Sequence, residues 1–390
     1  MSRIVFFCIP AHGHTNPTLA VVRELINRGH EVWYYSYEMM RQKIVDAGAR
    51  FIPCDSYNAE LRLSPADSAR LGIDLALSTR VLVDTTLALD EMVCREMERL
   101  KPDCIVADSM AVWGKAIALK KGIPFVSSTT TFAFNQHSAK SMKQSPGQLL
   151  RLLLSIPRIN RDLKRLRSRG YPVRSILDII ANDEKTHTIV YTSPEFQPCS
   201  ETFPDNYAFV GPSIRPAAAP LKKTREKLIY ISMGTVNNAM LELYRHCVEA
   251  LGETGHQVIL SIGNRVRPEE LGPHPANIEA YPQVDQIAVL EQADVFLTHC
   301  GMNSVSEALY FGVPLVMVPQ TPEQGAVAAR VETLGAGLRL KQTDPASILE
   351  AVTTLLTTPS FRENAESISA GFRRCTHAQG AADHILKLCK

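Results

Sequence analysis

Polar side chains that suit phosphate and hydroxyl groups follow an apolar segment late in the chain. Residues 293–298 predict a buried strand, which stops at His299 and Gly301 before a helix opens at Asn303 and Ser304. A strand that turns through glycine into a helix presents unpaired backbone N–H groups and the positive end of the helix dipole to an anion. We therefore expect a phosphate-bearing ligand at this turn.

A second strand end repeats this arrangement a few residues later. Residues 313–318 predict another buried strand, which ends at Pro319 and is followed by Gln320, Glu323 and Gln324. Two adjacent strand ends with these polar groups suit a ligand that carries both phosphates and hydroxyls. A nucleotide sugar fits that description.

This region resembles the donor-binding signature of family 1 glycosyltransferases, specifically the bacterial macrolide-type branch that uses UDP-sugars. The matching residues are THCGMNS at 298–304, Glu307, GVP at 312–314 and EQ at 323–324. The resemblance implies the GT-B fold, an α/β architecture of two facing Rossmann-like domains whose parallel sheets carry helices on both faces. It also implies a UDP-glycosyltransferase (hexosyltransferase) that takes the UDP-sugar as co-substrate and needs no cofactor and no metal.

A histidine-containing segment, residues 11–17, lies between an expected strand at 3–9 and an expected helix at 15–28. Open parallel sheets bind ligands at such strand ends. The segment resembles the family's G-H-x-N-P turn, whose histidine is the general base, and the match selects His14 over the neighbouring His12. Imidazole suits this role because its unperturbed pKa is about 6.5. The alternative is that His14 only caps the helix or bonds within the turn.

A base that becomes an imidazolium needs a carboxylate to orient it. Asp108 ends the expected strand at 104–107, and its segment resembles the family's strand with the partner aspartate. We expect Asp108 to fix the tautomer of His14 and to stabilise its charged form. The alternative is that Asp108 is the N-cap of a helix that starts near Ala111.

The resemblance assigns the nucleotide sugar to the second half of the chain. His299, assisted by Asn303 and Ser304, is expected to bind the diphosphate. The turn after the first strand of this half matches the family's glycine-containing turn through Ser232, Gly234 and Thr235.

Three acidic or amide side chains are expected on the sugars of the donor. Glu307 resembles the residue that accepts the ribose hydroxyls, although Ser304 and Glu307 also form an S-x-x-E capping box. Glu323 and Gln324 resemble the pair that binds the transferred sugar. The alternative for this pair is the polar start of a helix after Pro322.

The recognition of the base departs from the family pattern. Many relatives carry a tryptophan that stacks on the uracil, and Ala280 stands at that position here. Tyr281 and the region of Gln283 are left to contact the base, so UDP is less firmly indicated than a nucleotide sugar in general.

Apolar residues in the first half are candidates for acceptor binding. These are Trp113, Phe132, Phe134 and Met142, and the alternative is that they belong to the ordinary core. Residues 140–174 combine many basic side chains with an apolar run at 149–156, which indicates either a solvated helix face or a membrane-surface segment.

A weak internal repeat divides the chain. Strand–helix–strand patterns occupy residues 3–36 and 228–262, and Gly29 and Gly255 are expected to end the two helices. Such units are right-handed crossovers of parallel sheets. We expect an N-terminal acceptor-binding domain at 1–211, a proline-rich linker at 212–225, a C-terminal donor-binding domain at 226–376 and a last helix within 377–390 that can pack back on the first domain.

The composition is that of a globular protein. The chain has 390 residues, of which 45% are hydrophobic and 21% charged, and its net charge of +2 gives no support for nucleic acid binding. Nine cysteines without a C-x-x-C pair indicate reduced thiols instead of a disulfide framework or a zinc site. No segment has the roughly 18 consecutive apolar residues of a membrane span, and the N-terminal apolar run is too short for a signal peptide. We expect a cytoplasmic protein.

Together these features predict an inverting, metal-independent glycosyltransferase that moves glucose from UDP-glucose to a hydroxyl of an apolar small molecule, such as a macrolide, a flavonoid or another polyphenol. Two alternatives stay open: a membrane-surface lipid glycosyltransferase and a non-catalytic subunit that only binds nucleotide sugars.

Overall fold

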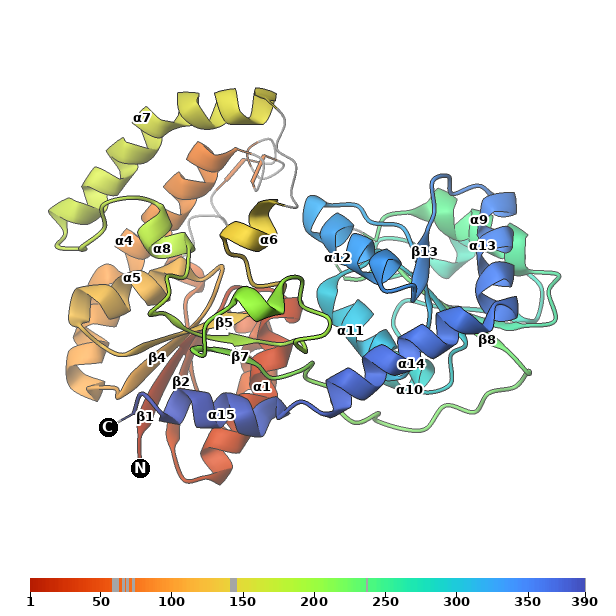
Figure 1. The fold of residues 1–390 in the computed structure, drawn as a ribbon, viewed down its shortest axis with the longest axis horizontal. Coiled ribbons are helices and arrows are strands. Elements are labelled where there is room, and N and C mark those ends of the chain that lie inside the picture. The colour runs from red at the N-terminus through yellow and green to blue at the C-terminus, as the bar shows by residue number, and fades with distance from the viewer. Residues whose placement is uncertain are drawn as a thin grey trace. The chain divides into compact units, whose positions relative to one another are not determined.

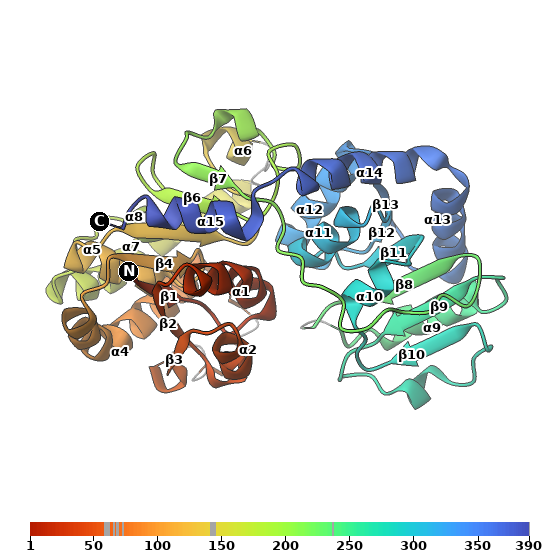
Figure 2. The same ribbon diagram turned by 90° about the horizontal axis from the view of Figure 1, so that it is seen from below.

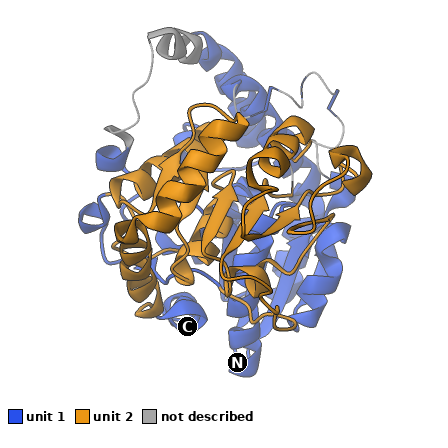
Figure 3. Cartoon of the chain, turned by 90° about the vertical axis from the view of Figure 1, so that its right-hand side faces the viewer, with its two compact units in different colours: residues 1–191, 199–213, 376–390 blue, residues 192–198, 214–375 orange. Residues whose placement is uncertain are grey.

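The computed structural model describes residues 1–57, 63–64, 67, 70–71, 74–140, 146–235 and 238–389. The chain forms two compact units, coloured separately in Figure 3. Unit 1 contains residues 1–191, 199–213 and 376–390, and unit 2 contains residues 192–198 and 214–375. Each unit is described by itself below.

The sheet of unit 1 has seven parallel strands in the order β3-β2-β1-β4-β5-β6-β7 (Figure 1). Their bounds are β1 (Arg3–Phe7), β2 (Glu31–Ser36), β3 (Arg50–Pro53), β4 (Cys104–Asp108), β5 (Phe125–Thr129), β6 (His187–Val190) and β7 (Tyr207–Phe209). Successive side chains of a strand point to opposite faces. Along β1, Ile4 and Phe6 therefore lie in one core, and Val5 and Phe7 lie in the other.

Helices cover both faces of this sheet. They are α1 (His12–Asn27), α2 (Arg41–Asp46), α4 (Leu75–Leu100), α5 (Val112–Lys121), α6 (Gln136–Lys140), α7 (Pro146–Ser168), α8 (Leu177–Ile180) and α15 (His377–Leu386). Helix α15, drawn in dark blue in Figure 2, packs against α1 and contacts β6 and β7, so this late segment is part of unit 1. None of the described helices is both long and apolar enough to cross a lipid bilayer.

The sheet of unit 2 has six parallel strands in the order β10-β9-β8-β11-β12-β13. Their bounds are β8 (Leu228–Ser232), β9 (Gln257–Ser261), β10 (Ile278–Tyr281), β11 (Val295–Thr298), β12 (Leu315–Met317) and β13 (Gly337–Arg339). The helices of this unit are α9 (Leu241–Leu251), α10 (Gln286–Leu290), α11 (Met302–Tyr310), α12 (Pro322–Thr333), α13 (Pro345–Thr357) and α14 (Pro359–Arg373).

The two glycines of the internal repeat end differently. Gly29 follows α1 with a φ of +83°, the left-handed conformation that glycine adopts easily. The expectation for Gly255 is wrong, because α9 ends at Leu251 with Gly252 as its C-cap, and Gly255 lies in the turn before β9 without a positive φ.

Candidate active site

The candidate residues of unit 1 lie where the order in which the chain adds strands to the sheet reverses, between β1 and β4. From β1 the chain continues outward through β2 and β3, and from β4 it continues in the opposite direction through β5, β6 and β7. Open parallel sheets bind ligands at the carboxyl ends of the strands on the two sides of such a reversal. His14 follows β1 and Asp108 is the last residue of β4, so both residues lie at this position. Helix α1 begins at His12, so His14 lies in its first turn and not in the turn before it.

His14 and Asp108 form a hydrogen bond of 2.7 Å between Nδ1 and Oδ2. The carboxylate is buried, and its other oxygen accepts a hydrogen bond of 2.9 Å from the backbone N–H of Met110. Asp108 is not a helix cap, because α5 has Ala111 as its N-cap and no side-chain cap. The alternative reading of this aspartate from the sequence is therefore wrong, and the carboxylate is held toward the imidazole.

A third residue touches the same ring atom. Thr130 Oγ1 lies 3.1 Å from Nδ1 of His14. Thr130 follows β5, which pairs with β4, so it occupies the neighbouring strand end. Thr130 was not among the residues predicted from the sequence, although a hydroxyl directly after a buried strand is a signal of such a position.

His12 has a different neighbour. Its Nδ1 lies 3.4 Å from Nζ of Lys43, and Lys43 also donates to Oδ1 of Asn16. Burial and the positive charge of Lys43 lower the pKa of His12. The structure therefore pairs only the second histidine of the segment with the carboxylate of Asp108.

The strand order of unit 2 also changes direction, between β8 and β11. These strands pair in parallel with Ser232 opposite Thr298, so the turns that follow them start at the same edge. These turns and the start of α11 carry the predicted residues Ser232, Gly234, Thr235, His299, Gly301, Asn303 and Ser304. Among them, Gly234 and Gly301 lie beside the His299 ring, which also bonds to the backbone of Ser232.

The His299 ring is enclosed by two glycines. A Cβ atom on Gly234 would lie 2.5 Å from Cε1 of His299, and one on Gly301 would lie 2.6 Å from Nε2. Gly234 also has a φ of +77°, which disfavours any other residue. Burial lowers the pKa of His299 to about 4, while a hydrogen bond to the backbone of Ser232 opposes this shift. The imidazole is therefore neutral at neutral pH.

Glu307 lies in α11 behind this turn. Its Oε2 accepts a hydrogen bond of 2.5 Å from Nε2 of Gln286, which also lies 3.5 Å from Ser304 Oγ. Burial raises the pKa of Glu307, against the hydrogen bond from Gln286 and the charge of Arg215. The capping-box alternative is wrong because α11 begins at Met302 with Gly301 as its N-cap. Gln286 was also not among the residues predicted from the sequence.

Glu323 and Gln324 lie in the first turn of α12. Thr321 is the N-cap, and its hydroxyl and the Gln324 side chain form a capping box. Gln324 Oε1 accepts hydrogen bonds from the backbone N–H groups of Gln320 and Thr321. Glu323 is exposed. Glu323 and Gln324 thus form the polar start of a helix, as the alternative from the sequence predicted.

The residues expected near the base lie at the end of β10. Tyr281 is 43% exposed, and its hydroxyl donates to Oε2 of Glu279 at 2.9 Å. Ala280 is partly buried against the core of unit 2, and Gln283 is exposed. An exposed tyrosine ring at this strand end is available for stacking.

The candidate acceptor residues that the structure describes differ in their exposure to solvent. Trp113 and Phe132 are buried, and Trp113 belongs to the core of unit 1, as its alternative held. Phe134 is 48% exposed, and Met142 lies outside the described residues. Of the three residues that the structure describes, Phe134 has the exposure that a contact with an apolar ligand requires.

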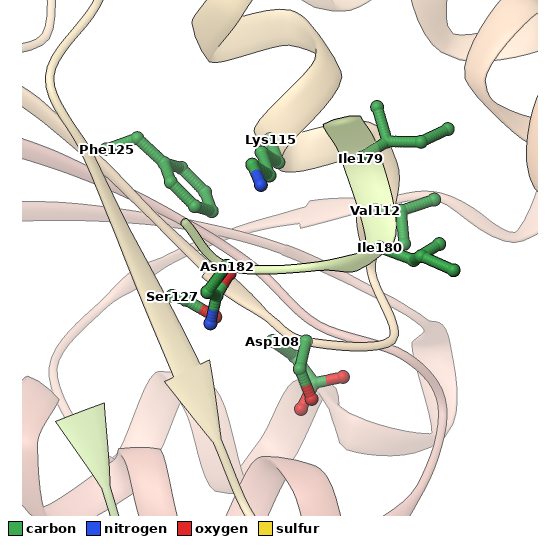
Figure 4. Close-up of a pocket in the computed structure, with 9 residues that line it drawn as sticks. Asp108, Val112, Lys115, Phe125, Ser127, Ile179, Ile180 and Asn182 are labelled. Atoms are coloured by element: carbon green, nitrogen blue, oxygen red, sulfur yellow. The ribbon is translucent and has the colours of Figure 1, made fainter. Parts of the chain in front are cut away.

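A small pocket lies beside Asp108 in unit 1 (Figure 4). It is lined by residues of β4, β5 and α5, by Ser109, and by Ile179, Ile180 and Asn182. Lys115 extends into it, and burial lowers the pKa of this lysine. Within the described ranges, no three His, Cys, Asp or Glu side chains are placed to share a metal ion.

Comparisons with known proteins identify the family of the chain. Residues 222–373 match the family model of UDP-glucoronosyl and UDP-glucosyl transferase. NDP-glycosyltransferase YjiC of Bacillus licheniformis is 33% identical, with 98% of this chain and 96% of that protein covered. Oleandomycin glycosyltransferase of Streptomyces antibioticus is 29% identical, with 98% and 90% covered.

The fold has a close solved counterpart. The crystal structure of the glycotransferase of kitacinnamycin superposes with a TM-score of 0.87 at 27% identity, covering 100% of this chain and 99% of that one. The two parallel-sheet α/β units thus confirm the GT-B fold that the sequence predicts. The chain belongs to the UDP-glucoronosyl and UDP-glucosyl transferase family, and it is a family 1 glycosyltransferase.

Proposed function

We propose that this glycosyltransferase moves glucose from UDP-glucose to a hydroxyl of an apolar small molecule, such as a macrolide, a flavonoid or another polyphenol, with inversion at the anomeric carbon. The 2.7 Å hydrogen bond between His14 and Asp108 carries the proposal. A protein that only binds nucleotide sugars gains nothing from a histidine paired with a buried carboxylate.

The paired side chains supply a general base. Asp108 accepts a hydrogen bond from Nδ1–H of the neutral His14 ring, which leaves the basic lone pair of the ring on Nε2. The acceptor hydroxyl gives its proton to Nε2, and the Asp108 carboxylate stabilises the resulting imidazolium. The acceptor oxygen forms a bond to the anomeric carbon while the bond from that carbon to the diphosphate breaks. Because attack and departure occur on opposite faces, an α-linked donor gives a β-glycoside.

The departing UDP gains negative charge, and unit 2 would stabilise it. His299 is neutral and can donate one hydrogen bond to the diphosphate, together with the Ser232 hydroxyl and the first N–H groups of α11. One such preorganised donor contributes about 2.7–4 kcal/mol in other enzymes. We propose that these donors act without a metal ion, consistent with the lack of a D-x-D motif in the sequence.

The sugars of the donor would meet the carboxylates and amides of unit 2. Glu307, oriented by Gln286, would accept hydrogen bonds from the ribose hydroxyls. Glu323 would accept from the transferred sugar. Because Oε1 of Gln324 is bonded to the backbone, its Nε2 would donate to a sugar hydroxyl. Tyr281 would stack on the base.

The acceptor class is supported by the names of similar proteins and by the exposed Phe134. To test the function, the protein is incubated with UDP- and dTDP-sugars and a panel of macrolides and polyphenols, and the products are identified by mass and by the anomeric coupling constant. A β-glucoside formed from UDP-glucose supports the proposal. An α-glucoside, or transfer from dTDP-sugars alone, contradicts the stereochemistry or the donor.

A second candidate function rests on helix α7. Leu154 and Ile156 are 68% and 41% exposed on this helix, and Arg158, Arg161 and Lys164 are exposed beside them. An amphipathic basic helix can bind an anionic membrane surface, where a lipid acceptor would be reached. Pelleting with anionic vesicles at low salt, reduced by Leu154→Ser, supports this function, and no pelleting excludes it.

A further inference from the structure

The carboxyl ends of three neighbouring strands are aligned in unit 2. Strands β9, β8 and β11 follow one another in the order of the sheet. Their register places Ser261 of β9 opposite Ser232 of β8, and Ser232 opposite Thr298 of β11. The segments that follow these strands therefore start from one line across the sheet, and they include the turns proposed to bind the diphosphate.

Asn238 is a buried residue that bonds to the turn after β8. It is 3% exposed, and its Nδ2 donates a hydrogen bond of 3.0 Å to the backbone carbonyl of Gly234. The N–H of Gly234 donates to Oγ of Ser232 at 3.4 Å. Both backbone polar groups of Gly234 thus have partners, which hold this residue in its conformation with a φ of +77°.

The amide of Asn238 has room because residue 263, which follows β9, is a glycine. A Cβ atom on Gly263 would lie 2.0 Å from Nδ2 and 2.4 Å from Cγ of Asn238. Gly263 has a φ of +75°, and its N–H donates to the carbonyl of Pro282 at 3.0 Å. Because the backbone of Gly263 is held by this bond, a side chain at this position would displace the amide of Asn238.

The contacts continue to the histidine of the proposed donor site. A Cβ atom on Gly234 would lie 2.5 Å from Cε1 of His299, so Gly234 packs closely on the imidazole. A line of contacts therefore runs from Gly263 through Asn238 and Gly234 to His299. Close-packed interiors transmit strain. A displacement of the Asn238 amide should therefore reach the imidazole.

Packing alone does not explain an asparagine at this position. Among the residues that the structure describes, Oδ1 of Asn238 has no hydrogen-bond partner, although it is buried. A buried acceptor without a partner lowers the stability of the folded state. An apolar residue of the same size would avoid this loss. The contact that an apolar residue could not make is the hydrogen bond to the carbonyl of Gly234.

We propose that Asn238 is a positioning residue of the donor site, which holds the turn at Gly234 in the conformation that binds the diphosphate of the nucleotide sugar. Asn238 is buried and acts through Gly234 and His299 without touching the ligand. This role rests on the proposed function, in which the turn binds the donor. Asn238 should therefore affect the binding of the diphosphate and not that of the nucleoside, which is assigned to Tyr281.

The test measures the dissociation constants of UDP and uridine for the full chain by NMR titration. In Asn238→Leu, a side chain of similar size stays beside Gly263, but the hydrogen bond to Gly234 is lost. We expect UDP to bind about 5- to 10-fold more weakly, the effect of one lost hydrogen bond, and uridine to bind within about twofold of the wild type. Asn238→Ala should give the same result. Unchanged UDP affinity in both variants, or an equal loss for UDP and uridine, overturns the proposal.

Gly263→Ala disturbs the same amide from its other side. The new Cβ must displace Asn238, so UDP should again bind about 5- to 10-fold more weakly. In the double variant with Asn238→Ala the amide is absent, so the Gly263→Ala substitution should cause little further loss. Additive losses in the double variant would contradict the proposed line of contacts.

Gly272→Ala is the matched control in unit 2. Gly272 has a φ of +77°, so alanine there meets the same backbone strain as at Gly263, but its Cβ would meet no atom within 4 Å. This variant should bind UDP as the wild type does. A loss of UDP affinity equal to that of Gly263→Ala would assign the effect to backbone strain and overturn the role of Asn238.

The wild type separates this proposal from the proposed function. If the wild type transfers glucose from UDP-glucose and the Asn238 variants keep its UDP affinity, only the role of Asn238 is overturned. If the wild type binds dTDP and not UDP, the same comparison is made with dTDP and thymidine. A wild type that binds neither diphosphate overturns the proposed donor site and the role of Asn238 with it.

Discussion

Nδ1 of His14 lies 2.7 Å from Oδ2 of Asp108, although the two residues are 94 positions apart in the sequence. The parallel pairing of β1 and β4 accounts for this proximity, because it places Phe7 opposite Ala107 and thus aligns the two strand ends. The pairing of the two strands thus holds His14 beside Asp108, and the role of each residue around this hydrogen bond can be tested by substitution.

Replacing His14 by alanine removes the proposed base. We expect His14→Ala to lower kcat by about 10²–10⁴, the typical contribution of a positioned general base, while UDP binding measured by calorimetry stays close to wild type. His12→Ala is the control and should change kcat little, since that ring contacts Lys43. A His14→Ala enzyme within a few-fold of wild type would show that the proton goes elsewhere.

Asp108 and Thr130 both contact the His14 ring, and we expect the loss of Asp108 to lower kcat more than the loss of Thr130. Asp108→Asn removes the charge that stabilises the imidazolium, and we expect it to lower kcat by about 10²–10⁴. Thr130→Val removes one neutral hydrogen bond of about 1 kcal/mol, so kcat should fall only about fivefold. Steady-state kinetics of both variants measure the order. An effect of Thr130→Val equal to that of Asp108→Asn would refute the assigned roles.

The glycine beside His299 should tolerate no side chain. In Gly234→Ala, the new Cβ would lie 2.5 Å from the imidazole at a backbone φ of +77°. We expect a loss of more than about 1 kcal/mol in stability and at least about a tenfold weaker binding of UDP. Gly255→Ala is the control, because its Cβ would meet no atom within 4 Å. Calorimetric titration with UDP compares the two, and equal affinities would argue against His299 in the donor site.

Acid should weaken the docking of helix α15. Burial, with the nearby charges of His187 and Lys387, lowers the pKa of His384 to about 4. An unfolded histidine titrates near 6.5, so the unfolded state binds a proton first as the pH falls. The stability contribution is complete above about pH 6.5 and is lost progressively down to about pH 4, by at most about 3 kcal/mol. Urea unfolding across this range measures the loss.

The variant His384→Phe should reduce this acid sensitivity, whereas replacement of the exposed His274 by phenylalanine should leave it in place. The same pH dependence in His384→Phe as in the wild type would assign the effect to other groups.

The strands that carry the site were predictable because buried parallel strands leave short apolar runs that end in polar residues. The strand expected at 104–107 forms β4, and His299 and Asp108 follow or end strands as expected. Helix boundaries were less predictable, since caps depend on local geometry. Gly301 caps α11 in place of Ser304, and Ala11 precedes α1.

Residues that act through tertiary contacts left little trace in the sequence. Thr130 and Gln286 reach His14 and Glu307 only because neighbouring strand ends and helices bring them there. Phe132 and Trp113 could not be assigned to core or ligand from their type alone, because aromatic side chains serve both purposes. Burial in the folded units separates them from Phe134.

The chain passes from unit 1 to unit 2 after Ser213 and returns to unit 1 at Thr376, and residues 192–198 also belong to unit 2. Hybrid enzymes that join the front half of one family member to the back half of another by a single crossover would therefore split unit 1 between two parents. A graft that exchanges residues 214–375 and keeps the original α15 leaves Arg28 with Asp383 and His187 with His384. Donor specificity is best transplanted as an internal cassette.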